Sequence, residues 1–252
     1  KYFFVFISPE RFQTHKFRAE MAAIGLDRSF AYAVIDEAHC LSEWGHDFRT
    51  SYLNLSNTIS RLAPNASYIG LTATASVNVL KDIQTEFGVL DENVRTPIEF
   101  TREELSFHVI DDLGKKSQAA LALVKTMEAK WCTDGSPKAG IVFTPTVNGP
   151  KGCYELAGRI SSSLGMEVNF YSGTAPKNYR LNGDAFDAHK QKVQQDFKAN
   201  KYRLMTATKA FGMGVNKPDV RHTLHAGMPS SMEAFYQEAG RAGRDRKPAY
   251  CG

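Results

Sequence analysis

The chain has 252 residues, which is enough for one large domain or for two domains of ordinary size. Its hydrophobic content of 42% and charged content of 23% are typical of globular proteins, and its apolar runs are too short to span a membrane. The formal net charge is only +4, which excludes a strongly basic chain, so any nucleic-acid binding requires a local basic surface.

The N-terminal segment and the cysteines bear on the location of the protein. The segment Lys1–Ile7 lacks the long apolar core and the cleavage site of a signal peptide. The cysteines are scattered and have no spacing typical of a metal site: Cys40, Cys132, Cys153 and Cys251. We therefore expect reduced thiols and an intracellular protein, in a bacterial cytoplasm or a nucleus, that does not act at a membrane.

The first hundred residues alternate between strand-like and helix-like segments. Short apolar runs predict buried strands at residues 2–7, 32–36 and 68–72. Apolar residues at helical intervals predict helices at Phe12–Ile24 and at Val77–Phe87, the second of which Gly88 ends. Strands that alternate with helices indicate parallel βαβ units, and hence an α/β fold.

The pattern breaks around Asp91–Leu105, where Pro97 and clustered charges indicate a connector. After it the alternation starts again, so we expect two domains, at residues 1–101 and 102–252. The second block predicts helices at 119–130, 154–164, 190–198 and 232–244, strands at 140–144, 167–171, 202–206 and 220–225, and a long loop at 171–187.

Two adjacent carboxylates, Asp36 and Glu37, follow the second predicted strand. Parallel α/β sheets bind ligands at the carboxyl ends of their strands, so this pair suits a Mg²⁺-nucleotide site. Asp36 would bind the metal while Glu37 positions or deprotonates the attacking water. The alternative is a solvated acidic turn.

The segment after the acidic pair is rich in aromatic and basic side chains. Trp44, His46, Phe48 and Arg49 lie within six positions, with Gly45 among them. Such a loop suits stacking on unpaired bases while its cations hold phosphates. The alternative is a loop whose aromatic side chains fold back into a core.

A second cluster of candidate residues lies near the C-terminus. Gln237, Arg241 and Arg244 are spaced i, i+4 and i+7, which predicts one face of the helix at 232–244. Gly240 and Gly243 would let this face approach another surface closely. A row of guanidinium groups suits an arginine finger that neutralises charge on a γ-phosphate, whereas the alternative is a solvated basic face.

Six segments of the sequence resemble motifs of the RecQ family of superfamily 2 DNA helicases. They occur in the family's order and at about its spacing: Ser8–Phe12, Asp36–His39, Cys40–Tyr52, Leu71–Ala75, Ala207–Arg221 and Tyr236–Asp245. The resemblance implies two RecA-like, P-loop-NTPase-type α/β domains with parallel sheets. Residues 1–101 would form the C-terminal half of the first domain, truncated at its N-terminus, and residues 102–252 the second domain.

The resemblance also assigns site residues. The catalytic set comprises Asp36, Glu37, His39, Gln237, Arg241 and Arg244, with Arg244 as the finger, Arg241 beside it and Gln237 as the link between nucleotide state and the interdomain contact. ATP and Mg²⁺ are the implied cofactors, with Asp36 as the metal ligand. Nucleotide contacts extend to Gly214, and Asn216 and Asp219 either order this loop or touch ribose and DNA.

The expected DNA contacts come from both blocks. They are Ser8, Arg11, Trp44, His46, Phe48, Arg49, Thr144, Thr206 and Lys209. Thr72 and Thr74 would couple the two domains, or serve as ordinary strand residues. Lys209 and Arg221 would otherwise be solvated charges.

The sequence departs from the family pattern in several places. No Gly-x-x-x-x-Gly-Lys-[Ser/Thr] motif occurs, and only 35 residues precede Asp36, so we expect an interior fragment of a longer helicase. The family's zinc-binding and winged-helix modules are also missing. Glu43 replaces a glutamine, Arg246 replaces a glycine, and residues 171–188 diverge.

The predicted function of the parent protein is ATP-driven 3′→5′ translocation on single-stranded DNA and unwinding of duplex DNA in repair or recombination, as a monomer. The first alternative is a non-catalytic DNA-binding or interaction module that has lost ATPase activity. The second is another superfamily 2 motor, such as an RNA helicase, against which the aromatic loop argues.

Overall fold

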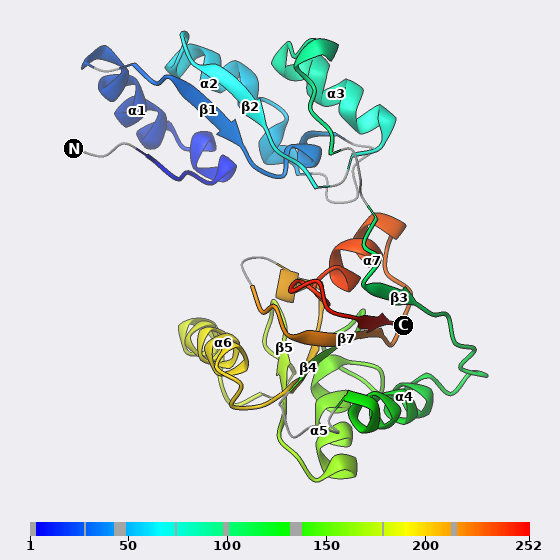
Figure 1. Ribbon diagram of the computed structural model, residues 1–252. Coiled ribbons are helices and arrows are strands. Elements are labelled where there is room, and N and C mark those ends of the chain that lie inside the picture. The colour runs from blue at the N-terminus through cyan, green and yellow to red at the C-terminus, as the bar shows by residue number, and fades with distance from the viewer. Residues whose placement is uncertain are drawn as a thin grey trace. The chain divides into compact units, whose positions relative to one another are not determined.

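The computed structural model describes residues 4–27, 29–42, 49–73, 75–97, 101–131, 138–177, 179–212 and 216–252. The chain forms two compact units, Lys1–Glu99 and Phe100–Gly252 (Figure 1). Within the described part, no helix is long and apolar enough to cross a bilayer.

The first unit is built on two parallel strands. β1 (Tyr32–Ile35) pairs with β2 (Ser67–Gly70), and Val34 lies opposite Ile69. Its helices are α1 (His15–Asp27), α2 (Leu55–Leu62) and α3 (Val77–Phe87). Its core combines strand, helix and turn residues: Ile35, Ala38, Cys40, Leu41, Tyr52, Leu55, Val79, Ile83 and Phe87.

Helix α3 has the bounds that the sequence predicts. The Ser76 hydroxyl caps its first turn by accepting a hydrogen bond from the Val79 amide at 3.4 Å. Gly88, at φ +62°, ends it in the left-handed conformation that glycine adopts most easily.

The predicted buried strand at residues 2–7 is wrong for the residues that the structure describes. Residues 4–8 are irregular, and the Phe6 side chain is 97% exposed. A strand needs a hydrogen-bonded neighbour, and the sheet of this unit pairs only β1 with β2 among the described residues.

The second unit contains a six-stranded parallel sheet in the order β3-β8-β7-β4-β6-β5. The strands are β3 (Leu105–Phe107), β4 (Ala139–Phe143), β5 (Val168–Tyr171), β6 (Leu204–Ala207), β7 (Val220–His225) and β8 (Ala249–Cys251). The three-residue strands β3 and β8 lie outside the predicted strands, and β3 begins where the connector was expected to end.

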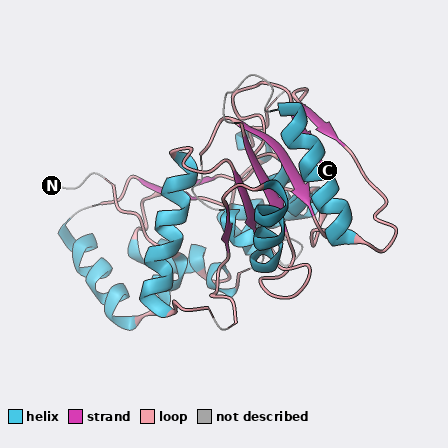
Figure 2. Cartoon of the chain, turned by 90° about the horizontal axis from the view of Figure 1, so that it is seen from below, coloured by secondary structure: helices cyan, strands magenta, loops and turns pink. Residues whose placement is uncertain are grey.

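Helices cover both faces of this sheet (Figure 2). α4 (Lys116–Trp131) and α5 (Cys153–Leu164) pack with Val142 and Leu224 on one face. α6 (Gly183–Lys198) packs with Ile141 and Met205 on the other, and the C-terminal end of α7 (Met232–Ala239) joins the same core. The successive β4 residues Ile141 and Val142 thus pack into cores on opposite faces of the sheet, as expected for a central strand.

Two predicted elements of the second unit have different bounds. The predicted loop at 171–187 is wrong at its end, because α6 begins at Gly183; Phe186 is buried seven residues before Val193 and so extends the apolar stripe. The predicted helix at 232–244 is also too long, because α7 ends at Ala239 and Gly243 adopts φ +60°.

A buried histidine lies in the centre of this sheet. His222 of β7 is 1% exposed, and both ring nitrogens lack a hydrogen-bond partner among the described residues. Its ring lies against Gly140, where an added Cβ would be 2.0 Å from Nε2. Burial lowers the pKa of His222 to about 4, so the imidazole is neutral at pH 7.

Replacing Gly140 by alanine tests this packing. We expect Gly140→Ala to lower the free energy of unfolding by about 2 kcal/mol or more, because β4 and the His222 ring must move apart. Gly158→Ala is the matched control on α5; its Cβ meets no atom within 4 Å, so we expect stabilisation by about 0.5–1 kcal/mol. Urea unfolding measures both, and equal midpoints would contradict the packing.

The buried histidine also predicts a pH dependence of stability. The unfolded state binds a proton near pH 6.5 and the folded state only near pH 4, so this stability is present above about pH 6.5 and is lost as the pH falls toward 4. We expect a loss of about 3 kcal/mol from this group. Urea unfolding at several pH values should give a shallower slope for His222→Phe than for the wild type; equal slopes would contradict the prediction.

Candidate nucleotide and nucleic-acid site

The acidic pair lies at the carboxyl end of β1. Asp36 is exposed there, and its Oδ1 accepts a hydrogen bond from the Glu37 amide at 3.0 Å. The Tyr52 hydroxyl donates to the Asp36 carbonyl at 3.2 Å. Glu37 adopts a left-handed conformation, φ 51° and ψ 46°, so the chain turns sharply after the strand. The two carboxylates are therefore held in a fixed turn.

A histidine joins this turn to the end of β2. His39 is buried, and its Nδ1 lies 2.9 Å from Thr72 Oγ1 and 3.3 Å from Glu37 Oε2. The backbone fixes the same junction, because the Ala38 amide donates to the Leu71 carbonyl at 2.9 Å. Glu37 and Thr72 thus meet at one imidazole. Thr74, the other expected coupling residue, lies outside the described residues.

The segment Ser8–Phe12 lies beside the base of the aromatic loop. Ser8 and Arg11 are exposed, and the Arg11 guanidinium lies 5.6 Å from the centroid of the Phe17 ring. Glu10 accepts a hydrogen bond from the Ser51 hydroxyl at 3.0 Å. A backbone hydrogen bond, Ser51 and the charge of Arg49 together lower the pKa of Glu10.

Of the expected base-stacking loop, only Arg49 can be placed. Its amide donates to the Cys40 carbonyl at 2.9 Å, so it sits where the loop returns to the acidic turn. Trp44, His46 and Phe48 lie outside the described residues.

The expected DNA contacts of the second unit differ in exposure. Thr144 and Thr206 are buried, and their hydroxyls donate to the carbonyls of Thr146 at 2.9 Å and Cys153 at 2.7 Å. These hydroxyls hold the loop after β4 and the start of α5. Lys209 is exposed in the turn after β6.

The loop before β7 is ordered by an ion pair. The buried Lys217 ammonium lies 3.1 Å from the Asp219 carboxylate. Asn216 accepts a hydrogen bond from Arg244 Nη1 at 3.4 Å. Gly214 lies outside the described residues.

The expected single helix face of Gln237, Arg241 and Arg244 is wrong. Gln237 belongs to α7, but the helix ends at Ala239 and both arginines lie in the following turn. Glycine is a poor helix former, and the turn uses a positive φ at Gly243. We call residues 240–248 the arginine loop.

The two arginines of this loop have different environments. Arg241 is buried, whereas Arg244 is exposed. Burial and the nearby charge of Arg244 lower the pKa of Arg241 to about 10, and Glu238 opposes this shift. Arg241 Nε has no hydrogen-bond partner among the described residues. A buried cation with an unused donor suits an anion such as a phosphate.

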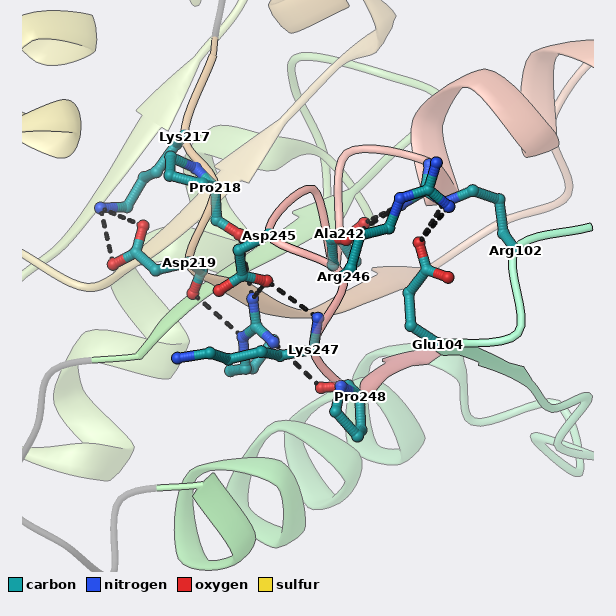
Figure 3. Close-up of polar contacts among 12 residues, drawn as sticks. Arg102, Glu104, Lys217, Pro218, Asp219, Ala242, Asp245, Arg246, Lys247 and Pro248 are labelled. Carbon is teal, nitrogen blue, oxygen red and sulfur yellow. Dashed lines mark hydrogen bonds and ion pairs between the residues drawn. The ribbon is translucent and has the colours of Figure 1, made fainter.

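Arg221 of β7 binds the far end of the arginine loop, where Figure 3 labels its partners Asp245 and Pro248. Arg221 is buried, and its Nη2 donates to Asp245 Oδ1 at 2.5 Å while Nη1 donates to the Pro248 carbonyl at 3.2 Å. Burial alone would raise the pKa of Asp245, but hydrogen bonds from Arg221 and the Lys247 amide lower it. The alternative of Arg221 as a solvated charge is therefore wrong, because the packing of β7 against the loop buries it.

The residues present fit part of a Mg²⁺-nucleotide complex. Magnesium takes oxygen ligands, commonly one or two carboxylates together with substrate phosphates, and the exposed Asp36 supplies such a carboxylate. No cluster of three His, Cys, Asp or Glu side chains occurs among the described residues. Any Mg²⁺ bound at Asp36 would therefore need phosphate or water ligands.

Comparison with known proteins first defines the class. Residues 2–83 match the DEAD/DEAH box helicase family and residues 122–246 match the helicase conserved C-terminal domain. The fold resembles that of Mss116p bound to single-stranded RNA and AMP-PNP, with a TM-score of 0.64 and 20% identity over 87% of this chain and 42% of that one. It also resembles the Mycobacterium smegmatis helicase Lhr, with a TM-score of 0.61 and 16% identity over 96% of this chain and 30% of that one. The chain has the α/β fold of RecA-like helicase domains.

Curated relatives then define the family. The probable ATP-dependent DNA helicase RecS of Bacillus subtilis is 34% identical over 99% of this chain and 45% of its own length. The ATP-dependent DNA helicase Q1 of Mus musculus is 34% identical over 98% of this chain and 35% of its own length. The chain belongs to the RecQ family of helicases, and it spans less than half the length of these relatives.

The contact between His39 and Thr72 predicts a measurable stability. We expect Thr72→Val to lower the free energy of unfolding by about 1 kcal/mol, because the buried imidazole loses one partner. Thr85→Val is the control, since that exposed hydroxyl bonds the Lys81 carbonyl of its own helix; we expect a change below about 0.5 kcal/mol. Urea unfolding compares the two, and equal effects would contradict the contact.

Proposed function

We propose that the native protein containing this chain is an ATP-dependent DNA helicase that moves 3′→5′ along single-stranded DNA and unwinds duplex DNA in repair or recombination. The observation that carries the proposal is the meeting of Glu37 and Thr72 at His39, because it joins the acidic turn to the end of the neighbouring strand. The similarity to proteins named ATP-dependent DNA helicases supports the same activity.

The acidic turn acts on the nucleotide in this proposal. Bound ATP with Mg²⁺ supplies a polarised γ-phosphoryl group. Asp36 binds the metal, Glu37 takes the proton of the attacking water, and His39 keeps the Glu37 carboxylate in place. The position of both carboxylates at a strand end supports these roles.

The arginine loop supplies positive charge to the nucleotide phosphates in this proposal. Arg244 acts as the finger, Arg241 binds the γ-phosphate beside it, and Gln237 responds to the nucleotide state. The unused Nε donor of the buried Arg241 supports an anion at this point. Gly214 and Asn216 contact the nucleotide in this proposal, and Asp219 pairs with Lys217 in the same segment of the sequence.

The proposed DNA contacts come from cations and from the aromatic loop. Arg11, Arg49 and Lys209 bind phosphates, and Ser8 donates a hydrogen bond to the strand. Trp44, His46 and Phe48 stack on unpaired bases and report DNA binding to the adjoining Asp36–His39 turn. Thr144 and Thr206 act through the backbone segments that their hydroxyls hold.

The same proposal covers the organisation of the native protein. Residues 1–101 are the C-terminal half of a first RecA-like domain, and residues 102–252 are the second. A P-loop, a zinc-binding module and a winged helix complete the native chain, which is an intracellular monomer. The chain matches 45% of the length of the relative RecS, which is consistent with further parts in the native protein.

A second candidate is a DNA-binding module without ATPase activity. No Gly-x-x-x-x-Gly-Lys-[Ser/Thr] motif occurs in the 252 residues, and this motif cradles the phosphates in P-loop ATPases.

Replacing Glu37 by glutamine in the native protein tests the proposal. We expect Glu37→Gln to lower the ATPase kcat by about 10² to 10⁴, because the amide cannot accept a proton from water. Binding of a fluorescent ATP analogue should change less than about threefold, since the charge of Asp36 and its site remain. Glu92→Gln, at an exposed glutamate of the turn Asp91–Asn93, is the control.

Comparing single-stranded DNA with RNA as the stimulating polymer completes this test. Stimulation by DNA alone supports the proposal, whereas stimulation by RNA alone would indicate an RNA motor. DNA binding by a wild-type protein that hydrolyses no ATP would favour the second candidate.

A further inference from the structure

We propose that Arg102 and Glu104 are positioning residues that hold the arginine loop so that Arg244 reaches the nucleotide. The inference rests on the proposed ATPase function. These two residues belong to the segment that opens the second unit, directly before β3.

Arg102 binds the backbone of the arginine loop directly (Figure 3). Its Nη2 donates to the carbonyls of Ala242 at 3.0 Å and Gly243 at 3.1 Å, across 140 and 141 residues of sequence. Both carbonyls lie between Arg241 and Arg244. One guanidinium therefore binds two of the three peptide groups that separate the two arginines.

Glu104 holds the guanidinium in that place. Its Oε1 accepts from Arg102 Nε and lies 3.3 Å from Arg246 Nη1. The Glu104 side chain is only 8% exposed. Burial opposes its ionisation, but the hydrogen bond from Arg102 lowers the pKa of Glu104 below its usual value. The Glu104 carboxylate thus contacts Arg102 at the start of the unit and Arg246 in the arginine loop.

The arginine loop is closely packed around Gly243, next to the contacts of Arg102 and Glu104. Gly243 has φ +60°, and a Cβ added there would lie 3.0 Å from Glu104 Cγ and 3.1 Å from the Lys247 carbonyl. The Gly243 amide donates to the Val220 carbonyl at 2.9 Å, while Arg221 binds Asp245 on the far side. Arg102 therefore binds the loop before Arg244 and Arg221 binds it after Arg244, and the Arg244 side chain between these contacts is exposed.

The alternative is that Arg102 only stabilises the fold. An arginine that binds carbonyls beyond a helix end does so in many proteins without any role in chemistry. The two roles differ in one respect. A positioning residue acts through Arg244, so its removal has little effect once Arg244 is gone, whereas a loss of folded protein reduces the rate in either background.

The test uses Arg102→Ala in the native protein, with kcat expressed per molecule that binds DNA so that unfolded protein is not counted. We expect the DNA-stimulated ATPase kcat to fall by about 10- to 100-fold, because small displacements of catalytic groups have effects of that size. Arg102→Lys should not restore the rate, since an ammonium lacks the planar fork that reaches Glu104 and both carbonyls.

Three further variants bracket this result. Glu104→Gln keeps an oxygen acceptor for Arg102 and should retain more activity than Glu104→Ala. Arg95→Ala is the matched control, because exposed Arg95 lies seven residues earlier and donates to the nearby Glu92 and Val94 carbonyls. It should behave as the wild type.

The decisive measurement combines Arg102→Ala with Arg244→Ala. In the Arg244→Ala background we expect the removal of Arg102 to lower kcat by less than about threefold, because its effect passes through the missing finger. Equal losses in both backgrounds, or wild-type activity of Arg102→Ala, would overturn the proposal.

Hydrogen exchange separates this result from a failure of the proposed function. Arg102→Ala should speed exchange of the amides in residues 240–247 by on the order of tenfold, whereas Arg95→Ala should not. If the wild type hydrolyses no ATP, the ATPase proposal fails, and the exchange rates still decide whether Arg102 holds the loop. Unchanged exchange would overturn the proposal whatever the activity.

Discussion

The parallel pairing of β1 with β2 is the constraint on which the acidic site depends. The pairing continues past the strands, since the Leu71 amide donates to the Ile35 carbonyl and the Leu71 carbonyl accepts from Ala38. Two segments more than thirty residues apart are thereby brought to one imidazole. A hydroxyl and a carboxylate at that imidazole give the turn one preferred arrangement, which an acidic turn in solvent would lack. The chemistry proposed for Glu37 thus begins with main-chain hydrogen bonds.

The arginine loop is ordered by a different principle. Here the backbone is irregular, and the half-buried Arg102 and the buried Arg221 replace the missing main-chain partners. Arg102 and Arg221 each bind at least one carboxylate and at least two carbonyls. Burying a charge is costly unless it is paired and hydrogen-bonded, so both depend on Glu104 and Asp245. Arg241 is the exception among the buried arginines of this region, because its Nε has no partner in the described residues.

Features encoded within a few residues could be predicted from the sequence. The bounds of α3 follow from Ser76, the apolar spacing and Gly88, and β7 has the predicted bounds Val220–His225. The family motifs located the acidic turn and the arginine loop. Features set by distant partners could not be predicted in this way. The sequence spacing of Gln237, Arg241 and Arg244 fits a helix, but the chain leaves the helix at Gly240. Arg102 carries no local signal, because its partners lie 140 residues away.

The pairing of β3 with β8 has a consequence for the synthesis of the protein. These strands join the first and last parts of the second unit, and Arg102 reaches the arginine loop over the same interval. A growing chain therefore exposes residues 102–107 without their partners until residues 249–251 have left the ribosome. Closing so long a loop is slow compared with forming local helices. The arginine loop would then be among the last parts of the unit to become ordered during translation.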